Sequence, residues 1–348
     1  MQVNAQHATP RRVLIIKPSA LGDVVTAIPV LRGLRRTFGQ SLRIDWLLSR
    51  SCAQLLAGES QLDGIVEFDR HRYGRMAFNV SVVRDFLRFC QGLRQAGYDW
   101  VIDLQGLFRS GLLSRVTGAA VRAGFELSRE GAALFYTHRL PAEQTPAHTV
   151  DRNIALAQML GIDARPTDYH LNLAPQGQRW AAGVKDRLGG PFLLIAPATR
   201  WKSKRYPAHH WRAVIESLRR RLPIVLVAAA GEAHLTAPLA GAQGVLDLAG
   251  QTSLPQLAGL VAAARGVVCC DSAIMHIAAA VGVPQVTLIG PTDPARTGPY
   301  GRGAGVLRAA LPCAGCRRRR CRHAACMESI LPAAVTAAVQ RHILEGPP

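Results

Sequence analysis

Short apolar runs alternate with segments of helical periodicity along most of the chain. In its first part the apolar runs cover residues 13–16, 44–48, 64–68 and 100–104. After the first of them, apolar side chains recur at the spacing of one helix face, at Val24, Ile28, Leu31, Leu34 and Phe38. This alternation predicts a parallel β-sheet with helices on both faces, which is an α/β fold.

A second alternating set begins after residue 191. Its apolar runs cover residues 192–196, 224–228, 245–248, 266–270 and 285–289, with helical patterns between them. Residues 140–191 contain several prolines and a helical pattern over 150–160, and we interpret them as the end of one domain and a linker. We therefore expect domains over 1–175 and 176–330, as two doubly wound Rossmann-like domains facing a cleft. Ligands of such domains bind at the carboxyl ends of the strands.

The composition fits two folded domains with an anionic partner. The chain has 348 residues, of which 49% are apolar and 19% charged, so disorder is excluded. No apolar run reaches the ~20 residues of a membrane helix, and none near the start suits a secretory signal, so we expect a cytoplasmic protein. The formal net charge of +19 favours nucleic acid, an anionic membrane face or phosphorylated substrates.

The cysteines fall into two groups. Cys52, Cys90, Cys269 and Cys270 lie in apolar segments and are expected to be free and buried. The other four form a compact cluster around the basic run 317–320, at Cys313, Cys316, Cys321 and Cys326. Their spacing admits a structural zinc ion or, less readily, an iron–sulfur cluster. The alternative is a set of reduced thiols in a basic loop.

The segment between the first strand and its helix is a candidate active-site loop. It reads Lys17-Pro18-Ser19-Ala20-Leu21-Gly22-Asp23. Gly22 allows the backbone to approach a ligand closely. Asp23 is placed either to cap the helix or to act as a base. The segment contains neither the glycine pattern of a dinucleotide site nor a Walker-type phosphate loop.

Three segments of the second domain suit a phosphorylated nucleotide. Asp271-Ser272-Ala273 follows a buried strand and begins a helix whose free amides favour anions, with His276 one turn later. Residues 199–206 place four cations at a strand end, and Glu232 follows the next strand, where an acid can bind ribose hydroxyls. The structural alternatives are a core histidine and a solvated basic loop.

Together these motifs resemble the lipopolysaccharide heptosyltransferase family. The resemblance runs from about residue 13 to residue 339 and includes the segments 17–23, 103–110, 271–276 and 290–294, in the family's order. Segment 103–110 reads Asp-Leu-Gln-Gly-Leu-Phe-Arg-Ser, and segment 290–294 reads Gly-Pro-Thr-Asp-Pro. The chain departs from the family at Ala273, where glycine is usual, and this leaves the choice of donor open.

The resemblance implies an inverting, metal-independent GT-B glycosyltransferase. It would move heptose from ADP-L-glycero-D-manno-heptose to the Kdo/heptose inner core of lipopolysaccharide, at the inner face of the inner membrane. The first domain would bind the acceptor and the second the donor, and a final helix over 331–348 would pack back towards the first domain. No cofactor is required on this reading.

The resemblance also assigns roles to individual residues. Asp23 would be the catalytic base, and Lys204 would stabilise the leaving diphosphate. Donor contacts are expected from Gly22, Thr199, Arg200, Glu232, Asp271, Ser272, Ala273, His276 and Thr292. Acceptor contacts are expected from Arg70, Arg72, Gln105, Arg109 and Arg129. The alternatives are another GT-B enzyme, such as a sugar-nucleotide epimerase, and a basic nucleic-acid-binding protein, although nucleic-acid motifs are lacking.

Overall fold

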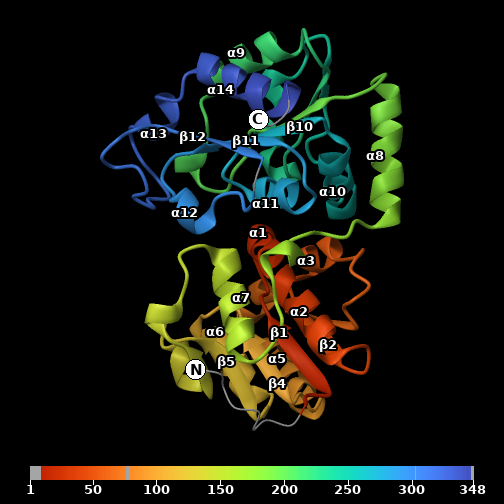
Figure 1. Cartoon of the computed structure of the whole chain (residues 1–348), viewed down its shortest axis with the longest axis vertical. Helices are drawn as coiled ribbons and strands as arrows, with labels where there is room; N and C mark the ends of the chain where they lie inside the picture. Colours follow the sequence, from red (N-terminus) through yellow and green to blue (C-terminus); the bar gives the residue numbers. More distant parts are fainter. Residues whose placement is uncertain (1–8, 76–78, 302, 346–348) are drawn as a thin grey trace. The chain divides into compact units, whose positions relative to one another are not determined.

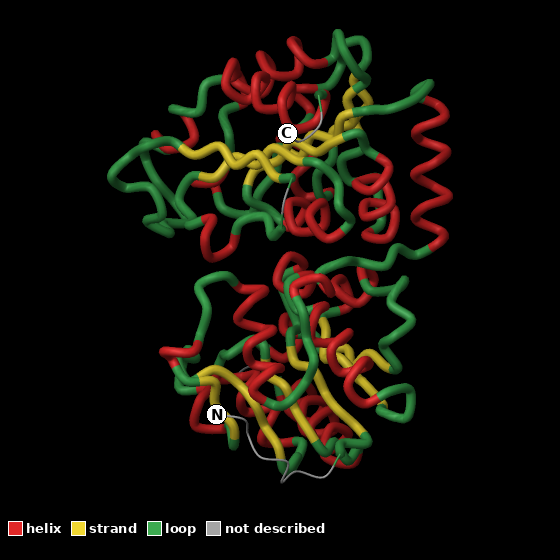
Figure 2. The backbone as a smooth tube through the Cα atoms, in the orientation of Figure 1, coloured by secondary structure: helices red, strands yellow, loops and turns green. Residues whose placement is uncertain are grey.

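Two compact units make up the chain in its computed structural model, which describes residues 9–75, 79–301 and 303–345. The units are Met1–Tyr169 and His170–Pro348, so the division falls somewhat before the expected boundary. Each unit is built on one parallel six-stranded sheet. Figures 1 and 2 show helices around the strands of each unit. The expected α/β class is therefore confirmed, with two doubly wound sheets.

The first sheet has the strand order β3-β2-β1-β4-β5-β6. Its strands are β1 (Arg12–Ile16), β2 (Arg43–Leu48), β3 (Gly64–Glu67), β4 (Trp100–Asp103), β5 (Val121–Phe125) and β6 (His138–Leu140). The helices are α1 (Leu21–Val25), α2 (Ile28–Phe38), α3 (Arg50–Leu55), α4 (Arg70–Tyr73), α5 (Val80–Gln95), α6 (Phe108–Val116) and α7 (Thr149–Met159). Short 3-10 turns occupy η2 (Ala132–Phe135), η3 (Ala142–Gln144) and η4 (Pro166–Asp168). The direction of winding reverses between β1 and β4, where such folds bind ligands.

Helices cover both faces of this sheet, which explains its continuous apolar strands. On one face, Leu14 and Ile16 of β1 share a core with Val82 and Leu93 of α5. On the other face α2 packs against α7. Gly33 of α2 allows a close approach there, because a Cβ atom at this position would lie 2.8 Å from Ala164.

The second sheet repeats this topology, with the order β12-β11-β10-β7-β8-β9. Its strands are β7 (Leu193–Ala196), β8 (Ile224–Leu226), β9 (Val245–Asp247), β10 (Gly266–Cys270), β11 (Gln285–Ile289) and β12 (Ala304–Arg308). The helices are α8 (Pro175–Arg187), α9 (Ala208–Leu218), α10 (Leu254–Ala263), α11 (Ala273–Ala280), α12 (Pro294–Thr297), α13 (Ala325–Glu328) and α14 (Pro332–Val339). The shorter turns are η5 (Lys202–Lys204), η6 (Ala230–Leu235), η7 (Ala237–Leu239) and the π-helical η8 (Gln340–Leu344). Figure 1 shows α9 and α14 on one face of the sheet and α10 and α11 on the other.

The segment expected as a linker is largely helical. It contains α7 and the 13-residue α8, which starts with Pro175 at its first position. Proline is favoured there because the first helical N–H has no partner to lose, so the proline signals a helix start rather than a break. Helix α8 packs closely on α10, since a Cβ atom on Gly259 would lie 2.4 Å from the carbonyl oxygen of Gly177.

The C-terminal helix belongs to the second unit. Val335, Ala338 and Val339 of α14 are buried in one core cluster with Trp211 of α9. Ile343 of η8 joins the same cluster. Residues 346–348 of the expected segment lie outside the described residues. Packing of this segment towards the first unit stays a prediction.

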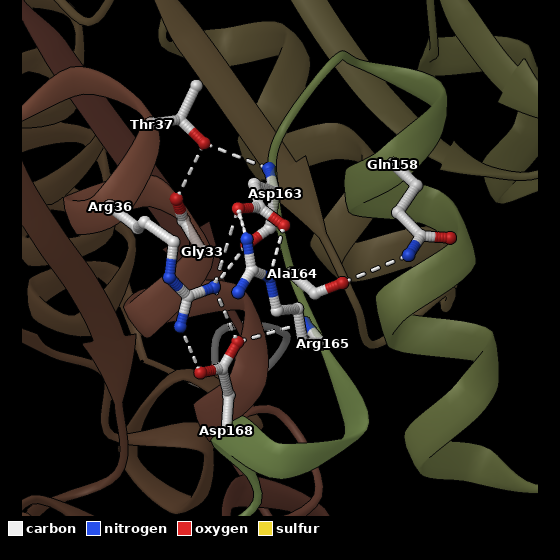
Figure 3. A network of polar contacts seen from close by, with 8 residues as sticks. All are labelled: Gly33, Arg36, Thr37, Gln158, Asp163, Ala164, Arg165 and Asp168. Atoms are coloured by element: carbon white, nitrogen blue, oxygen red, sulfur yellow. Dashed lines mark hydrogen bonds and ion pairs between the residues drawn. The ribbon is translucent and has the colours of Figure 1, made fainter.

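A buried carboxylate anchors the end of the first unit to α2. Figure 3 shows Arg36 facing Asp168, with Asp163 and Arg165 beside them. The Arg36 Nη1 atom lies 2.9 Å from Asp168 Oδ2, and Nη2 pairs with the other carboxylate oxygen. The backbone N–H of Arg165 also donates to Asp168 Oδ2, at 2.8 Å. Asp168 is buried, so these bonds replace its hydration.

We expect Asp168→Ala to destabilise the first unit by about 1.5–3 kcal/mol, because several bonds to a buried charge are lost. Asp163→Ala is the matched control, since this exposed carboxylate pairs with the same arginines and should contribute little. Urea unfolding followed by circular dichroism measures both. Equal effects of the two substitutions would contradict the anchoring role of Asp168.

Candidate active site

Asp23 lies at the carboxyl end of β1 and partly caps α1. Its Oδ2 atom accepts a hydrogen bond from the backbone N–H of Ala20, at 3.1 Å. Asp23 is half-buried, and Gly22 beside it is buried. The capping alternative is therefore present in the structure, and it engages one carboxylate oxygen. A single capping bond is compatible with proton transfer at the other oxygen.

Lys17 is a buried cation at the point where the first sheet reverses direction. Its Nζ atom donates to the carbonyl oxygen of Leu104 at 2.6 Å and so joins the ends of β1 and β4. Burial lowers the pKa of Lys17, whereas the carboxylates of Asp23 and then Asp103 act in the opposite direction. No role was predicted for Lys17 from the sequence. The only signal was a lysine directly after a strand apolar on both faces.

Asp103 organises the loop that follows β4. It is fully buried, and its Oδ1 atom accepts from the backbone N–H groups of Gln105 and Gly106, at 2.9 and 3.2 Å. The hydroxyl of Tyr136 donates to Oδ2 at 2.6 Å. Burial raises the pKa of Asp103, and these hydrogen bonds lower it. Gln105 Oε1 is buried without a hydrogen-bond partner among the described residues, so it remains available to a ligand.

The predicted acceptor arginines follow other strands of the same sheet. Arg70 and Arg72 come after β3, Arg109 after β4 and Arg129 after β5, and all are exposed. Arg72 pairs with Asp85 of α5. The backbone N–H of Arg129 donates to the carbonyl oxygen of Gly106 at 2.9 Å, which connects two of these loops. The carboxyl ends of parallel strands share one edge, so the sheet gathers these residues on the side of Asp23.

In the second unit a lysine closes the corresponding reversal between β7 and β10. Lys204 Nζ lies 2.7 Å from Asp271 Oδ2, and Thr292 Oγ1 donates to the same carboxylate oxygen. Asp271 ends β10, and Thr292 follows β11, so three separate loops meet in this cluster. The structure thus brings together three residues that the sequence motifs singled out separately.

The basic loop after β7 is folded on itself. Thr199 is buried and its hydroxyl donates to the carbonyl oxygen of Trp201 at 2.9 Å. Lys204 Nζ lies 4.5 Å from the centre of the Trp201 ring, in a cation–π contact. Arg205 donates to the carbonyl oxygen of Thr199 at 3.2 Å and lies 3.9 Å from Glu232. Trp201 and Arg205 were not among the predicted residues, and Arg200 is exposed.

The start of α11 offers an unused hydroxyl. Ser272 is the N-cap residue, but its side chain caps no backbone N–H. Its Oγ atom is buried without a hydrogen-bond partner among the described residues. Ala273 is the first residue of the helix, and His276 is buried one turn further on. The free amides and the Ser272 hydroxyl form an arrangement suited to a phosphate group.

The cysteine loop, residues 313–326, lies against the basic loop. The Ser203 hydroxyl donates to the carbonyl oxygen of Arg318 at 2.6 Å, and the Arg319 guanidinium lies 5.3 Å from the Trp201 ring centre. Cys313, Cys316 and Cys321 are exposed and Cys326 is buried. Among the described residues, the cysteine sulfur atoms form no group of three or more with other ligand atoms, so the suggested zinc finds no support.

The thiols of this loop differ in their surroundings. The pKa of Cys321 is lowered, mainly by the backbone N–H groups of Ala324 and His323, with a smaller contribution from Arg318. Burial raises the pKa of Cys326. Arg318 of the arginine run therefore contributes little to the lowered pKa of Cys321. Cys52, Cys269 and Cys270 are buried as expected, whereas Cys90 on α5 is only partly buried.

No helix in the described part of the chain is both long and apolar enough to span a bilayer. This agrees with the absence of a long apolar run in the sequence.

Comparison with known proteins identifies the family. The model described as glycosyltransferase family 9 (heptosyltransferase) matches residues 86–326. Lipopolysaccharide heptosyltransferase 1 of Pseudomonas aeruginosa is 30% identical over 316 residues, which span 89% of this chain and 87% of that protein. Lipopolysaccharide heptosyltransferase 2 of Escherichia coli (strain K12) is 27% identical over 85% of this chain and 88% of that protein.

Solved structures agree with this result. E. coli heptosyltransferase WaaC with ADP-2-deoxy-2-fluoro heptose gives a TM-score of 0.75 at 27% identity and covers 94% of this chain and 99% of that chain. E. coli ADP-heptose lps heptosyltransferase II gives 0.76 at 23% identity, covering 96% and 99%, which supports the fold alone. The expected transferase activity and GT-B fold are confirmed, and the epimerase and nucleic-acid alternatives are disfavoured. The chain belongs to glycosyltransferase family 9, the heptosyltransferases.

Proposed function

We propose that the enzyme transfers heptose from ADP-L-glycero-D-manno-heptose to the Kdo/heptose inner core of lipopolysaccharide. The relatives named above are lipopolysaccharide heptosyltransferases, and WaaC has been solved with a fluorinated ADP-heptose. The observation that carries the proposal is the cluster of Lys204, Asp271 and Thr292 beside the free start of α11. This cluster provides cationic and amide groups for a diphosphate at the ligand-binding edge of the second sheet.

The donor half of the reaction is a charge-stabilisation problem. Cleavage of the bond between the sugar and the diphosphate leaves positive charge on the sugar ring and negative charge on the leaving ADP. The sequence has no Asp-x-Asp motif for a divalent metal, so protein groups are assigned to the developing negative charge. Lys204, Arg200 and the first amides of α11 have this role. Donors that are already oriented stabilise a transition state without reorganisation.

The acceptor half requires removal of a proton. Asp23 accepts the proton of the attacking hydroxyl while the hydroxyl oxygen forms its bond to the anomeric carbon. One direct displacement inverts that carbon. Lys17 lies close enough to interact electrostatically with Asp23, whose carboxylate raises the pKa of Lys17 against the larger effect of burial. The proton therefore passes from the acceptor to Asp23, and the electron pair of the broken bond leaves with ADP.

The exposed arginines fit an acidic acceptor. Kdo carries a carboxylate, and the planar guanidinium group binds carboxylates and phosphates through two parallel hydrogen bonds. Arg70, Arg109 and Arg129 are exposed at the same sheet edge as Asp23. Gln105 adds a buried oxygen that can accept from a sugar hydroxyl. Their joint effect is a binding surface for an anionic sugar.

Helix α5 is the surface that we assign to the membrane. Val80, Val83 and Leu87 are exposed along one side of this helix. Arg84 and Arg88 are exposed between them, at the spacing of the same face. A helix with an apolar and basic outer face binds the interface of anionic bilayers. The enzyme would thus reach a lipid-anchored acceptor as a peripheral protein on the inner face of the inner membrane.

Asp23→Asn should lower turnover by about 10²- to 10⁴-fold, the usual contribution of a general base. Asparagine keeps an oxygen for the capping bond from Ala20 but cannot take a proton. Donor affinity, measured by calorimetry, should stay unchanged. Asp186→Asn, on the exposed side of α8, is the control and should keep full turnover. Wild-type turnover in the Asp23 variant would remove Asp23 from the mechanism.

Lys204→Ala should weaken ADP-heptose binding by about 10- to 100-fold, since a charged hydrogen bond contributes about 1.5–3 kcal/mol. Lys202→Ala is the matched control from the same loop, where the side chain is exposed. Calorimetric titration with ADP-heptose, UDP-glucose and GDP-mannose measures affinity and nucleotide preference together. Equal loss in both variants would indicate a general charge effect, and preference for another nucleotide would overturn the proposed donor.

Leu87→Ser should reduce binding to phosphatidylglycerol vesicles by about 10-fold or more, because a buried leucine contributes about 1.5–3 kcal/mol. Leu331→Ser is the control, since both leucines are 61% exposed and Leu331 lies in the other unit. Vesicle flotation measures binding, and raised salt should weaken it through the arginines. If the control variant lost binding equally, or salt had no effect, α5 would not be the docking helix.

A further inference from the structure

We propose that His209, His210 and Glu328 form a binding site for a borderline transition-metal ion, with Zn²⁺ as the best fit. His209 Nε2 lies 3.2 Å and His210 Nε2 4.0 Å from Glu328 Oε1. One ligand atom from each residue lies within 4.8 Å of the others. This is the single such group that the described residues contain. The site is separate from the sugar-transfer residues and does not rest on the proposed function.

The separations are close to those between ligands of a tetrahedral ion. Zinc binds imidazole nitrogen and carboxylate oxygen at about 2.0–2.2 Å, so two of its ligands lie about 3.3–3.6 Å apart. The two measured separations lie on either side of this range, and a small rotation of the exposed His209 and Glu328 side chains would adjust them. Two imidazoles with one carboxylate favour zinc, nickel or cobalt over magnesium and calcium, which prefer oxygen ligands.

The three side chains are held to different degrees. The His210 side chain is only 13% exposed, and its ring lies 5.1 Å from the ring of Tyr206, between ring centres. The side chains of His209 and Glu328 are 64% and 52% exposed. His210 therefore supplies a fixed ligand, and the other two can close on an ion from solvent. Water completes the coordination at the open side, as in three-ligand zinc sites.

The site would connect two distant segments of the second unit. His209 and His210 are in the first turn of α9, and Glu328 is the last residue of α13. A hydrogen bond already joins the neighbourhoods of these two segments: the Tyr206 hydroxyl donates to the carbonyl oxygen of Ile330 at 2.6 Å. Helix α13 directly follows the cysteine loop, whose Arg318 contacts the basic loop at Ser203. A bound ion would therefore hold the end of the cysteine loop in place.

The test uses untagged full-length enzyme in which Cys313, Cys316 and Cys321 are replaced by serine. This background removes the exposed thiols, which would otherwise compete for the ion. Calorimetric titration with ZnCl₂ should show one site with a dissociation constant of about 10⁻⁶ M. Cobalt should give the visible absorption of tetrahedral Co²⁺ without a thiolate charge-transfer band. Zinc should also raise the melting temperature of this protein.

Three variants and one control complete the experiment. His209→Gln, His210→Gln and Glu328→Gln should each weaken zinc binding at least 10-fold and remove the thermal stabilisation. His234→Gln changes an exposed histidine of the same unit and should leave binding unchanged. His209 is so exposed that its replacement should not affect folding, which circular dichroism checks. The proposal is overturned if the serine background binds no zinc, or if binding survives in the Glu328 and His209 variants.

Discussion

Parallel strands deliver all their carboxyl ends to one edge of a sheet, and the functional residues depend on this constraint. In each unit the strand order reverses beside the first strand. The loops after the two strands at this point run in opposite directions, and polar groups at their ends are left without strand partners. A lysine fills this place twice. Lys17 reaches the carbonyl oxygen of Leu104, and Lys204 reaches Asp271. The same topology therefore produces two cationic positions, one beside the acid Asp23 and one beside the start of α11.

Most of the fold could be predicted from the sequence where burial is uniform. Strands β1, β10 and β11 are buried along almost their whole length because helices cover both faces, so mostly apolar runs mark them in the sequence. Strands β5 and β12 were missed because Arg122, Gly124 and Gly305 interrupt their apolar pattern. Helix α8 was missed because it begins with a proline. In a sequence, proline can mark either the start of a helix or a break in one.

The candidate site divides in the same way. Motifs along the chain identified Asp23, Lys204 and Asp271, since each lies in a segment that follows a recognisable strand. The burial of Lys17 and the stacking of Lys204 on Trp201 depend on the tertiary packing of side chains, which the local sequence pattern does not show. The contact between Ser203 and Arg318 joins segments more than a hundred residues apart, and no local period encodes it. Sequence therefore indicates which loops matter, whereas tertiary packing decides which side chains within them meet.

The net positive charge comes from the excess of lysine and arginine over acidic residues. The chain has 23 acidic residues against 42 lysines and arginines, and several acids are committed to internal pairs. Glu59 is buried against Arg32, and Asp168 against Arg36. Exposed arginines such as Arg109 and Arg129 therefore contribute to a positive electrostatic potential at the surface. Salt screens exposed charges far more than buried pairs, so ionic strength should act on the encounter with an anionic acceptor much more than on the stability of the fold.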